Sequence, residues 1–346
     1  MTIPSPAASA AKPRGPLRTW LRRLAFVAGG GALLLLTGWA AAALYFDVRV
    51  PALRAPLAGL YGLAVLAGWI LVQRRVRVLF PLGGFILVLA WWLSLRPSND
   101  RAWQPDVAVL PYAEIAGSRV TVHHIRNCDY RTPADFDVRH YDRTYDLDAL
   151  RTVDLYMVYW GSPHMAHTMV SFGFADGAYL CFSIETRKET GEDYSAVKGL
   201  FRQFELTYVV ADERDLVRLR TNYREGEDVY LFRLNTTPVQ AREFFLSYVR
   251  TMNDLAREPR WYNAATNNCT LGIRVQRAVS DRAPWDWRML VNGHCDELLY
   301  ERGKISTALP LAELKRASLI NPRARAVGAG TDFSAAMRQG LPDLAP

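Results

Sequence analysis

The chain has 346 residues, a formal net charge of +8, and a composition that is 50% hydrophobic and 12% aromatic. This composition excludes long disordered stretches, which contain few apolar and aromatic residues. The positive charge is unevenly placed, because the first 96 residues hold eleven basic residues and one acidic residue, a net charge of +10. The other 250 residues hold 31 basic and 33 acidic residues, and a net charge of −2 argues against a nucleic-acid partner.

Three uncharged stretches follow a basic N-terminal arm of residues 1–23. They are Leu24–Phe46, Ala55–Val72 and Val78–Leu95, with 23, 18 and 18 residues. A bilayer core of ~30 Å requires roughly 20 apolar residues in a helix, so the first stretch is long enough and the other two are near the lower limit. We predict a membrane anchor of three transmembrane helices over residues 24–96. Buried helices of a soluble protein are the alternative, and the first stretch is too long for a typical signal peptide.

The basic residues near these stretches predict the orientation of the anchor. Five lie in the N-terminal arm and three lie between residues 73 and 77, whereas the loop of residues 47–54 holds two basic residues and one acidic residue. Basic loops favour the cytoplasmic side, so we expect a cytoplasmic N-terminus. Three crossings then place everything after Arg96 on the far side of the membrane. Loss of only one of the two shorter crossings would reverse that conclusion.

The remainder of the chain is predicted to be an α+β domain, because several short β runs are accompanied by helices. We expect a linker and domain start over residues 97–119, a domain over 120–320 and a largely irregular C-terminal tail over 321–346. The predicted strands are Arg119–Ile125, Val153–Tyr159, Ala166–Phe174, Ala178–Thr186, Phe204–Val210 and Val229–Leu234. One helix follows Thr237-Pro238, a capping hydroxyl before a proline, and runs to about Leu255. A second helix is expected from near Asn268 to about Val279.

The predicted hairpin of residues 166–186 brings polar residues together. If Ala175-Asp176-Gly177 forms a three-residue loop, Phe174 pairs with Ala178, and His167 then lies opposite Glu185 with Ser183 one diagonal step away. A histidine with a polar partner is what a cysteine–histidine site requires, since the partner fixes the tautomer of the base. A solvated polar face is the alternative interpretation, and a slip of one residue would remove the pairing.

The segment WYNAATNNCTLGIR, residues 261–274, predicts a helix that begins beside a cysteine. Asn267 or Asn268 is a suitable N-cap residue and places Cys269 in the first turn. The helix dipole and the free backbone N–H groups there favour a thiolate and can also hold an oxyanion. A small buried cysteine at a capped helix start is the alternative. The other cysteines, Cys128, Cys181 and Cys295, permit a disulfide in an oxidising compartment, with the pairing left open.

Other chemistries find little support in the sequence. His164 and His167 are three residues apart and His123-His124 lies upstream, but Pro163 argues against helical ligand spacing. The phosphate-binding, serine-hydrolase and zinc-protease motifs are not found in the sequence. We therefore expect neither a metal nor a cofactor. The charged segment ADERDLVRLRTNYREGED, residues 211–228, is predicted to form a solvated face.

Several of these segments together resemble the Lnb N-terminal periplasmic domain family over residues from about 120 to 342. The resemblance is carried by IRNCDYRTPADFD, AHTMVSFGF followed by SIETRKE, ELTYVVADERDLVRLRT and YNAATNNCT. It implies a permuted papain-like domain with a mostly antiparallel sheet, in which His167 precedes Cys269. The family's named member is a bacterial lipoprotein N-acyltransferase, whose multi-span membrane part follows the domain, whereas the apolar segments precede it here.

These observations predict a membrane-anchored periplasmic cysteine acyltransferase or hydrolase that acts through a thioester. Cys269 would be the nucleophile and His167 its base, with Glu185 or Ser183 orienting His167 and with Asn268 and the helix N-terminus stabilising the oxyanion. Inner-membrane lipids are the expected neighbours, and lipid, lipoprotein or cell-wall compounds are the expected substrates. The alternatives are a cell-wall peptidase or amidase with the same site, and a non-catalytic envelope binding or scaffold domain.

Overall fold

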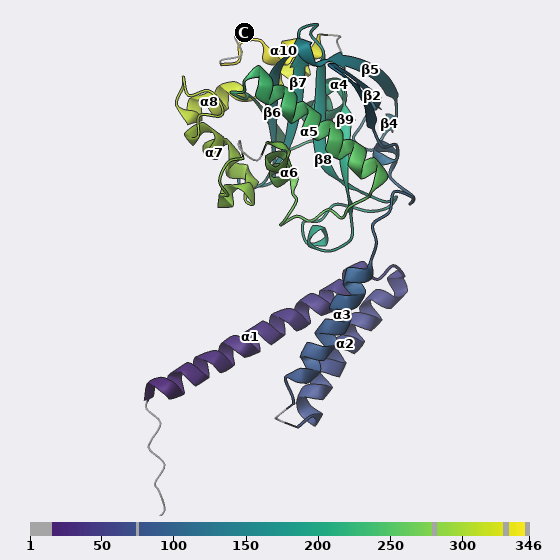
Figure 1. Ribbon diagram of the computed structural model, residues 1–346, viewed down its shortest axis with the longest axis vertical. Helices are drawn as coiled ribbons and strands as arrows, with labels where there is room; N and C mark the ends of the chain where they lie inside the picture. The colour runs from purple at the N-terminus through teal and green to yellow at the C-terminus, as the bar shows by residue number, and fades with distance from the viewer. Residues whose placement is uncertain (1–15, 74–75, 279–281, 328–331, 343–346) are drawn as a thin grey trace, which may run out of the picture. The chain divides into compact units, whose positions relative to one another are not determined.

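The structure is a computed structural model that describes residues 16–73, 76–278, 282–327 and 332–342 (Figure 1). The chain divides into two compact units, Met1–Arg96 and Pro97–Pro346. The regular secondary structure described in the first unit is helical, and the second unit combines a large sheet with helices on both of its faces.

The N-terminal unit consists of α1 (Pro16–Asp47), α2 (Pro51–Leu71) and α3 (Leu79–Ser94). Two of its segments, Arg23–Asp47 and Pro51–Leu71, are long and apolar enough to cross a membrane. The predicted third crossing is corrected, because α3 has only 16 residues. At 1.5 Å per residue it extends about 24 Å, which is less than the ~30 Å core of a bilayer.

The C-terminal unit is built on an eight-stranded sheet with the order β1-β2-β9-β8-β7-β6-β10, and β5 pairs with β2. Every pairing is antiparallel except that of β2 with β9. The strands are β1 (Tyr112–Ala116), β2 (Arg119–Arg126), β5 (His140–Asp146), β6 (Leu150–Trp160), β7 (Ala166–Phe174), β8 (Tyr179–Arg187), β9 (Glu205–Ala211) and β10 (Glu227–Arg233). The small strands β3 (Asp129–Tyr130) and β4 (Phe136–Asp137) pair separately. All six predicted strands are present, and the predicted α+β class with a mostly antiparallel sheet is confirmed.

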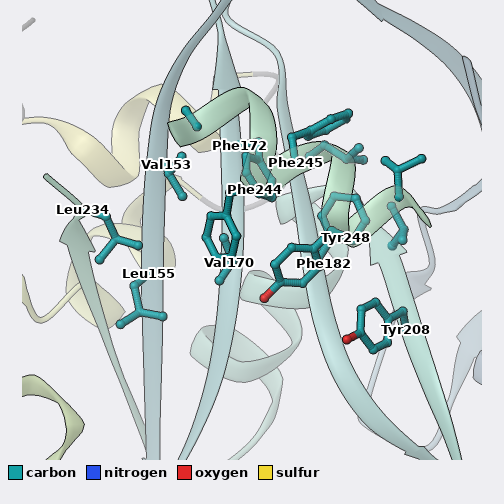
Figure 2. Close-up of a cluster of buried hydrophobic side chains, with 14 of the residues drawn as sticks. Val153, Leu155, Val170, Phe172, Phe182, Tyr208, Leu234, Phe244, Phe245 and Tyr248 are labelled. Carbon is teal, nitrogen blue, oxygen red and sulfur yellow. The ribbon is translucent and has the colours of Figure 1, made fainter. Parts of the chain in front are cut away.

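Helix α5 (Pro238–Arg257) covers one face of the sheet and buries the main core (Figure 2). It begins at a capping box in which Thr237 and Gln240 satisfy each other's backbone N–H groups. Phe244 and Tyr248 on its apolar face are buried, and their rings pack on Phe172 and Phe182 of the central hairpin. Figure 2 shows the rings of Phe244, Phe245 and Tyr248 from the helix beside those of Phe172 and Phe182 from the strands. The aromatic face of the β7–β8 hairpin therefore packs against α5. The side chains on the opposite face of the hairpin remain available for other contacts.

The opposite face of the sheet is covered by α4 (Glu213–Arg218), α9 (Asn321–Val327) and α10 (Phe333–Arg338). Two of these helices correct the prediction of a largely irregular tail after residue 321. Phe333 and Met337 are fully buried, and Arg338 reaches the buried carboxylates of Asp154 and Glu213. Helices this short are not stable alone, so tertiary packing and buried ion pairs account for them.

Three further helices complete the unit: α6 (Cys269–Gln276), α7 (Cys295–Glu301) and α8 (Leu311–Ser318). Helix α6 begins where the sequence predicts and ends at Gln276, whereas the expected end at Val279 lies outside the described residues. All four cysteines are buried free thiols, so the possible disulfide does not form.

Candidate active site

The β7–β8 hairpin adopts the predicted register. The Phe174 N–H donates to the Ala178 carbonyl at 2.9 Å, and Met169 pairs with Ser183 further along the ladder. Gly177 has a φ of 80°, a left-handed conformation that suits glycine in a three-residue hairpin loop. This register brings His167 across from Glu185.

His167, Ser183 and Glu185 form a closed hydrogen-bonded group. His167 Nε2 lies 2.7 Å from Ser183 Oγ and 3.0 Å from Glu185 Oε1. The Ser183 hydroxyl donates to Glu185 Oε1 at 2.6 Å, so Ser183 Oγ accepts from the imidazole Nε2–H. Sequence reasoning left open whether Ser183 or Glu185 contacts the imidazole, and the structure places both there. Their contacts fix the ring orientation and leave Nδ1 for a partner on the other side.

Two arginines support the carboxylates behind the histidine. Arg220 Nη2 lies 3.2 Å from Glu185 and its Nη1 lies 3.3 Å from Glu227, which Arg224 also contacts. Burial alone would raise the pKa of Glu185, but the charges and hydrogen bonds of His167 and Arg220 hold it well below its usual value.

The burial of Arg220 corrects the prediction that residues 211–228 form a solvated face. Asp215 and Thr221 are fully buried in the same segment. Charged side chains of this segment can be buried because they pair with opposite charges. Asp215, for example, accepts two hydrogen bonds from Arg126.

Cys269 is the first residue of α6 and is buried beside the hairpin. Asn268 is the N-cap, and its Oδ1 accepts from the Leu271 N–H at 2.9 Å. Its Nδ2 donates to the Met289 carbonyl at 3.3 Å. The side-chain amide of Asn268 is thus hydrogen-bonded through both its oxygen and its nitrogen, and the oxyanion role predicted for Asn268 stays a prediction. The first-turn N–H of Cys269 itself has no intrahelical acceptor available.

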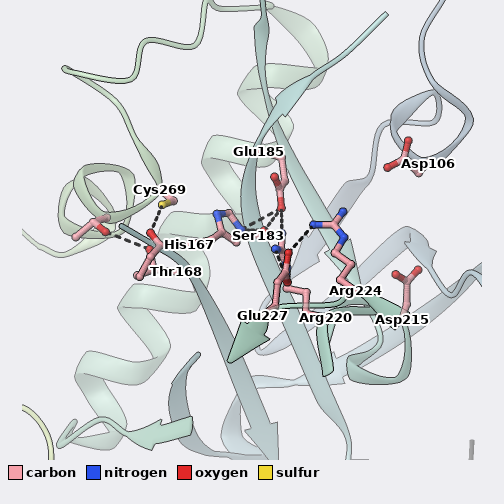
Figure 3. Close-up of polar contacts among 12 residues, drawn as sticks. Asp106, His167, Thr168, Ser183, Glu185, Asp215, Arg220, Arg224, Glu227 and Cys269 are labelled. Carbon is pink, nitrogen blue, oxygen red and sulfur yellow. Dashed lines mark hydrogen bonds and ion pairs between the residues drawn. The ribbon is translucent and has the colours of Figure 1, made fainter. Parts of the chain in front are cut away.

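Cys269 and His167 lie close enough for each to shift the pKa of the other. Burial would raise the pKa of the thiol, but the hydrogen bond and charge of His167 outweigh it and lower the pKa of Cys269 to about 7. Burial would lower the pKa of the imidazole, yet the Glu185 carboxylate raises the pKa of His167 to about 9. Figure 3 shows the His167 ring between the thiol and Glu185. This arrangement favours a thiolate–imidazolium pair near neutral pH.

Asn292 is a site residue that the sequence analysis missed. It opens the 3-10 helix η7 (Asn292–His294), and its Nδ2 lies 3.5 Å from Cys269 Sγ. The Ala166 N–H donates to its Oδ1 at 3.0 Å, which turns the amide so that Nδ2 faces the sulfur. The only local signal is the dipeptide Asn292-Gly293, which in sequence is typical of a turn.

A cavity of ≈ 360 Å³ opens onto the Cys269–His167 pair. Apolar side chains line much of it, and the arginines behind Glu185 lie at another part of its wall. Its lining includes Trp160, Met165, Tyr194, Tyr262, Leu290, Arg220 and Arg224. The reactive pair therefore has room beside it for the acyl part of a substrate and for a polar group.

The remaining histidines make other contacts. His164 Nδ1 lies 2.8 Å from His294 Nε2, and His294 lies 3.0 Å from Glu297. His123 pairs with Asp142 at 2.7 Å. Within the described ranges, no group of three or more histidine, cysteine or acidic side chains is arranged to hold a metal ion.

Residues 137–293 match the family model of the Lnb N-terminal periplasmic domain, the family that the sequence resembles. The match includes the hairpin, Cys269 and Asn292. No curated protein and no solved structure is significantly similar to the chain, so the permuted papain-like topology remains a prediction. The family match and the two apolar helices indicate a membrane-anchored protein with a periplasmic domain.

Proposed function

We propose that the periplasmic domain is a cysteine-dependent acyltransferase or hydrolase that forms a thioester on Cys269. The observation that supports this most is the pairing of Cys269 and His167 at the wall of the cavity, with the pKa of the thiol lowered to about 7. A buried cysteine with a purely structural role has its pKa raised, because burial disfavours the thiolate. Burial raises the pKa of Cys295 to about 12 in the same core.

In the acylation step, the Cys269 thiolate attacks the carbonyl carbon of an ester, thioester or amide. A carbon–sulfur bond forms, and the carbonyl π electrons move to the oxygen. When the intermediate collapses, the bond to the leaving group breaks, and the His167 imidazolium transfers its proton to the departing oxygen, sulfur or nitrogen. Glu185 and Ser183 hold the ring in place throughout, so they are positioning residues.

The oxyanion requires donors on one side of the sulfur. Asn292 Nδ2 is already 3.5 Å from Sγ, and the first-turn N–H of Cys269 lies at the positive end of α6. We assign the oxyanion site to these two donors. Each such donor is worth roughly 10²–10³ in kcat in well-studied acyl transfer sites.

In the second step, neutral His167 removes a proton from the acceptor, which attacks the thioester carbonyl and releases the Cys269 thiolate. An amine acceptor gives an N-acyl product, and water gives a free acid. A cell-wall peptidase or amidase would use the same residues with water as acceptor. Lipid, lipoprotein and other cell-envelope compounds are the proposed substrates, because the domain belongs to a membrane-anchored chain.

The nucleophile assignment can be tested with the full-length protein in detergent, incubated with a thiol-reactive fatty-acyl probe at pH 7. We expect one adduct, on Cys269, to be found by peptide mass spectrometry, and Cys269→Ser to abolish it. Cys295→Ser is the matched control, because it removes another buried thiol and should leave labelling intact. Unchanged labelling of Cys269→Ser would contradict the proposal and favour a non-catalytic binding or scaffold domain.

A further inference from the structure

Exposed apolar side chains lie at the Cys269 cavity and in the chain segments next to its lining residues. We use the name apolar rim for six of them, each between 43% and 61% exposed: Met165, Tyr194, Val197, Trp285, Trp287 and Leu290. Three of the six, Met165, Tyr194 and Leu290, also line the cavity. The Trp287 ring packs on His294, whose ring contacts His164 beside Met165. Segments far apart in sequence therefore present apolar side chains at the same opening.

Side chains of this kind are costly to leave in water when they are gathered together. Contiguous exposed apolar patches on soluble domains commonly mark an interaction surface. Tryptophan and tyrosine are favoured where a protein meets the interfacial region of a bilayer, because each has an apolar ring and a polar group. The rim segments are nearly neutral in charge, since residues 188–203 hold three basic and three acidic residues. Attraction to a surface would therefore depend on apolar contact rather than on charge.

The chain also enters the domain beside this rim. Arg101 pairs with Glu189 at 2.8 Å, and Gln104 donates to the Glu192 carbonyl at 2.7 Å, two residues before Tyr194. The Ser98 N–H is already bound to Glu205 at 3.0 Å. Only residues 95–97 lie between Ser98 and the end of α3 at Ser94, so this tether reaches roughly 14 Å at full extension. The first residues of the domain therefore lie next to the segment that carries Tyr194 of the apolar rim.

We infer that the apolar rim docks on the lipid bilayer, so that the cavity opens onto the membrane. For what enters the cavity, this inference rests on the proposed function, and the substrates are those proposed above. The docking surface is composed of apolar side chains that contact the acyl-chain boundary, and the cavity behind it leads to Cys269.

The docking can be measured on the full-length protein in phosphatidylcholine nanodiscs. A polarity-sensitive fluorophore is attached at Trp287→Cys in a Cys269→Ser background, where the other three cysteines are buried. Val239→Cys is the matched control, since Val239 is 66% exposed and lies sixteen residues before Leu255 on α5, roughly 24 Å along the helix. Leu255 is near the tether, because Asn99 donates to its carbonyl at 3.0 Å.

We expect spin-labelled lipids to quench the fluorophore at position 287 at least about threefold more than at position 239. High salt should not change this ratio. Equal quenching at the two positions would overturn the inference. If quenching is equal and the detergent-solubilised protein forms dimers that Trp287→Ser disrupts, the rim binds a second copy of the chain instead.

A second measurement separates docking from the chemistry of Cys269. In Trp285→Ser/Trp287→Ser, acyl release from phosphatidylcholine in the nanodiscs should fall about tenfold, while alkylation of Cys269 by iodoacetamide stays unchanged. Full acyl release in this variant would contradict the docking. Failure of iodoacetamide to alkylate Cys269 in the unsubstituted protein at pH 7 would contradict the proposed function, while the quenching ratio would still decide the docking.

Discussion

The Glu185 carboxylate lies 3.0 Å from Nε2 of His167, on the side of the ring that does not face Cys269. The negative charge of Glu185 therefore stabilises a positive imidazolium on one side of the ring, and the Cys269 thiolate stabilises it on the other side. Arg220 contacts the same carboxylate and keeps it ionised. The reactivity of the cysteine thus depends on a carboxylate that it does not touch.

Replacing Glu185 by Gln should weaken the ion pair of the site. Loss of the negative charge lowers the pKa of His167, and the pKa of Cys269 then rises towards its ordinary value. We expect the rate of alkylation by iodoacetamide at pH 6.5 to fall about tenfold, since each unit in pKa changes the thiolate fraction by about that factor. The exposed residue Glu258 provides the control Glu258→Gln, which should react as the unsubstituted protein does. An unchanged rate in Glu185→Gln would exclude this electrostatic role.

Acylation should follow a bell-shaped pH profile. A rise through about pH 7 deprotonates Cys269 and increases the rate, whereas a rise through about pH 9 deprotonates His167 and removes the acid for the leaving group. The two limits belong to the coupled pair rather than to single residues. The release of 4-nitroaniline from an acyl 4-nitroanilide measures leaving-group departure, because the amide nitrogen must be protonated to leave, and simple alkylation should lack the descending limb. A descending limb in both assays would contradict the assignment of His167 as the acid.

Asn292→Ala tests the proposed oxyanion donor. We expect the single-turnover acylation rate to fall about tenfold or more, because the developing charge loses a preorganised donor. Alkylation by iodoacetamide passes through no oxyanion, so it should change much less. If both rates fall equally, Asn292 acts on the thiolate and not on the oxyanion.

Arg338→Met should destabilise the C-terminal unit. Asp154 and Glu213 are fully buried, and both lose a partner in this variant. Removal of one member of a buried ionic network costs about 3–5 kcal/mol. Thermal unfolding of the full-length protein in detergent should show a clearly lower Tm. The exposed residue Arg316 on α8 offers the control Arg316→Met, which should unfold close to the original temperature.

The orientation of the anchor yields a separate prediction. The basic residues of the N-terminal arm, residues 1–23, and those between residues 73 and 77 predict a cytoplasmic N-terminus. With a periplasmic domain, this orientation requires an odd number of crossings, whereas the two helices that are long enough to cross, α1 and α2, would leave the N-terminus in the periplasm. A membrane-impermeant thiol reagent applied to intact spheroplasts should fail to label Thr2→Cys and should label it after lysis. Labelling before lysis would instead indicate a periplasmic N-terminus and two crossings.

Sequence reasoning predicted the hairpin side of the site well. Its loop contains one glycine that must be left-handed, and its arms alternate strictly, so the register and the placement of His167, Ser183 and Glu185 follow from local rules. The start of α6 at Cys269 was predicted for a similar reason, because an asparagine cap gives a strong local signal.

The groups that sequence reasoning missed are those whose roles depend on distant partners. In the sequence, Arg220 lies among alternating charges that are typical of a surface. Only the folded sheet brings Glu185 and Glu227 into contact with it. In the sequence, Asn292 is typical of a turn. Its amide is oriented by the hydrogen bond from the Ala166 N–H, which the sequence does not indicate. The C-terminal helices depend in the same way on Asp154 and Glu213, 125 or more residues away in the chain.

The four unpaired thiols of the domain determine how it would react with oxidants in a disulfide-forming compartment. Burial holds the pKa of Cys128 and Cys295 at about 12, and that of Cys181 well above its usual value, so these thiols stay protonated and inert. Cys269 alone is poised to ionise at neutral pH. Among the four thiols, we therefore expect oxidants to react first with Cys269, and the proposed nucleophile would tie the catalytic lifetime of the protein to the redox balance of the envelope.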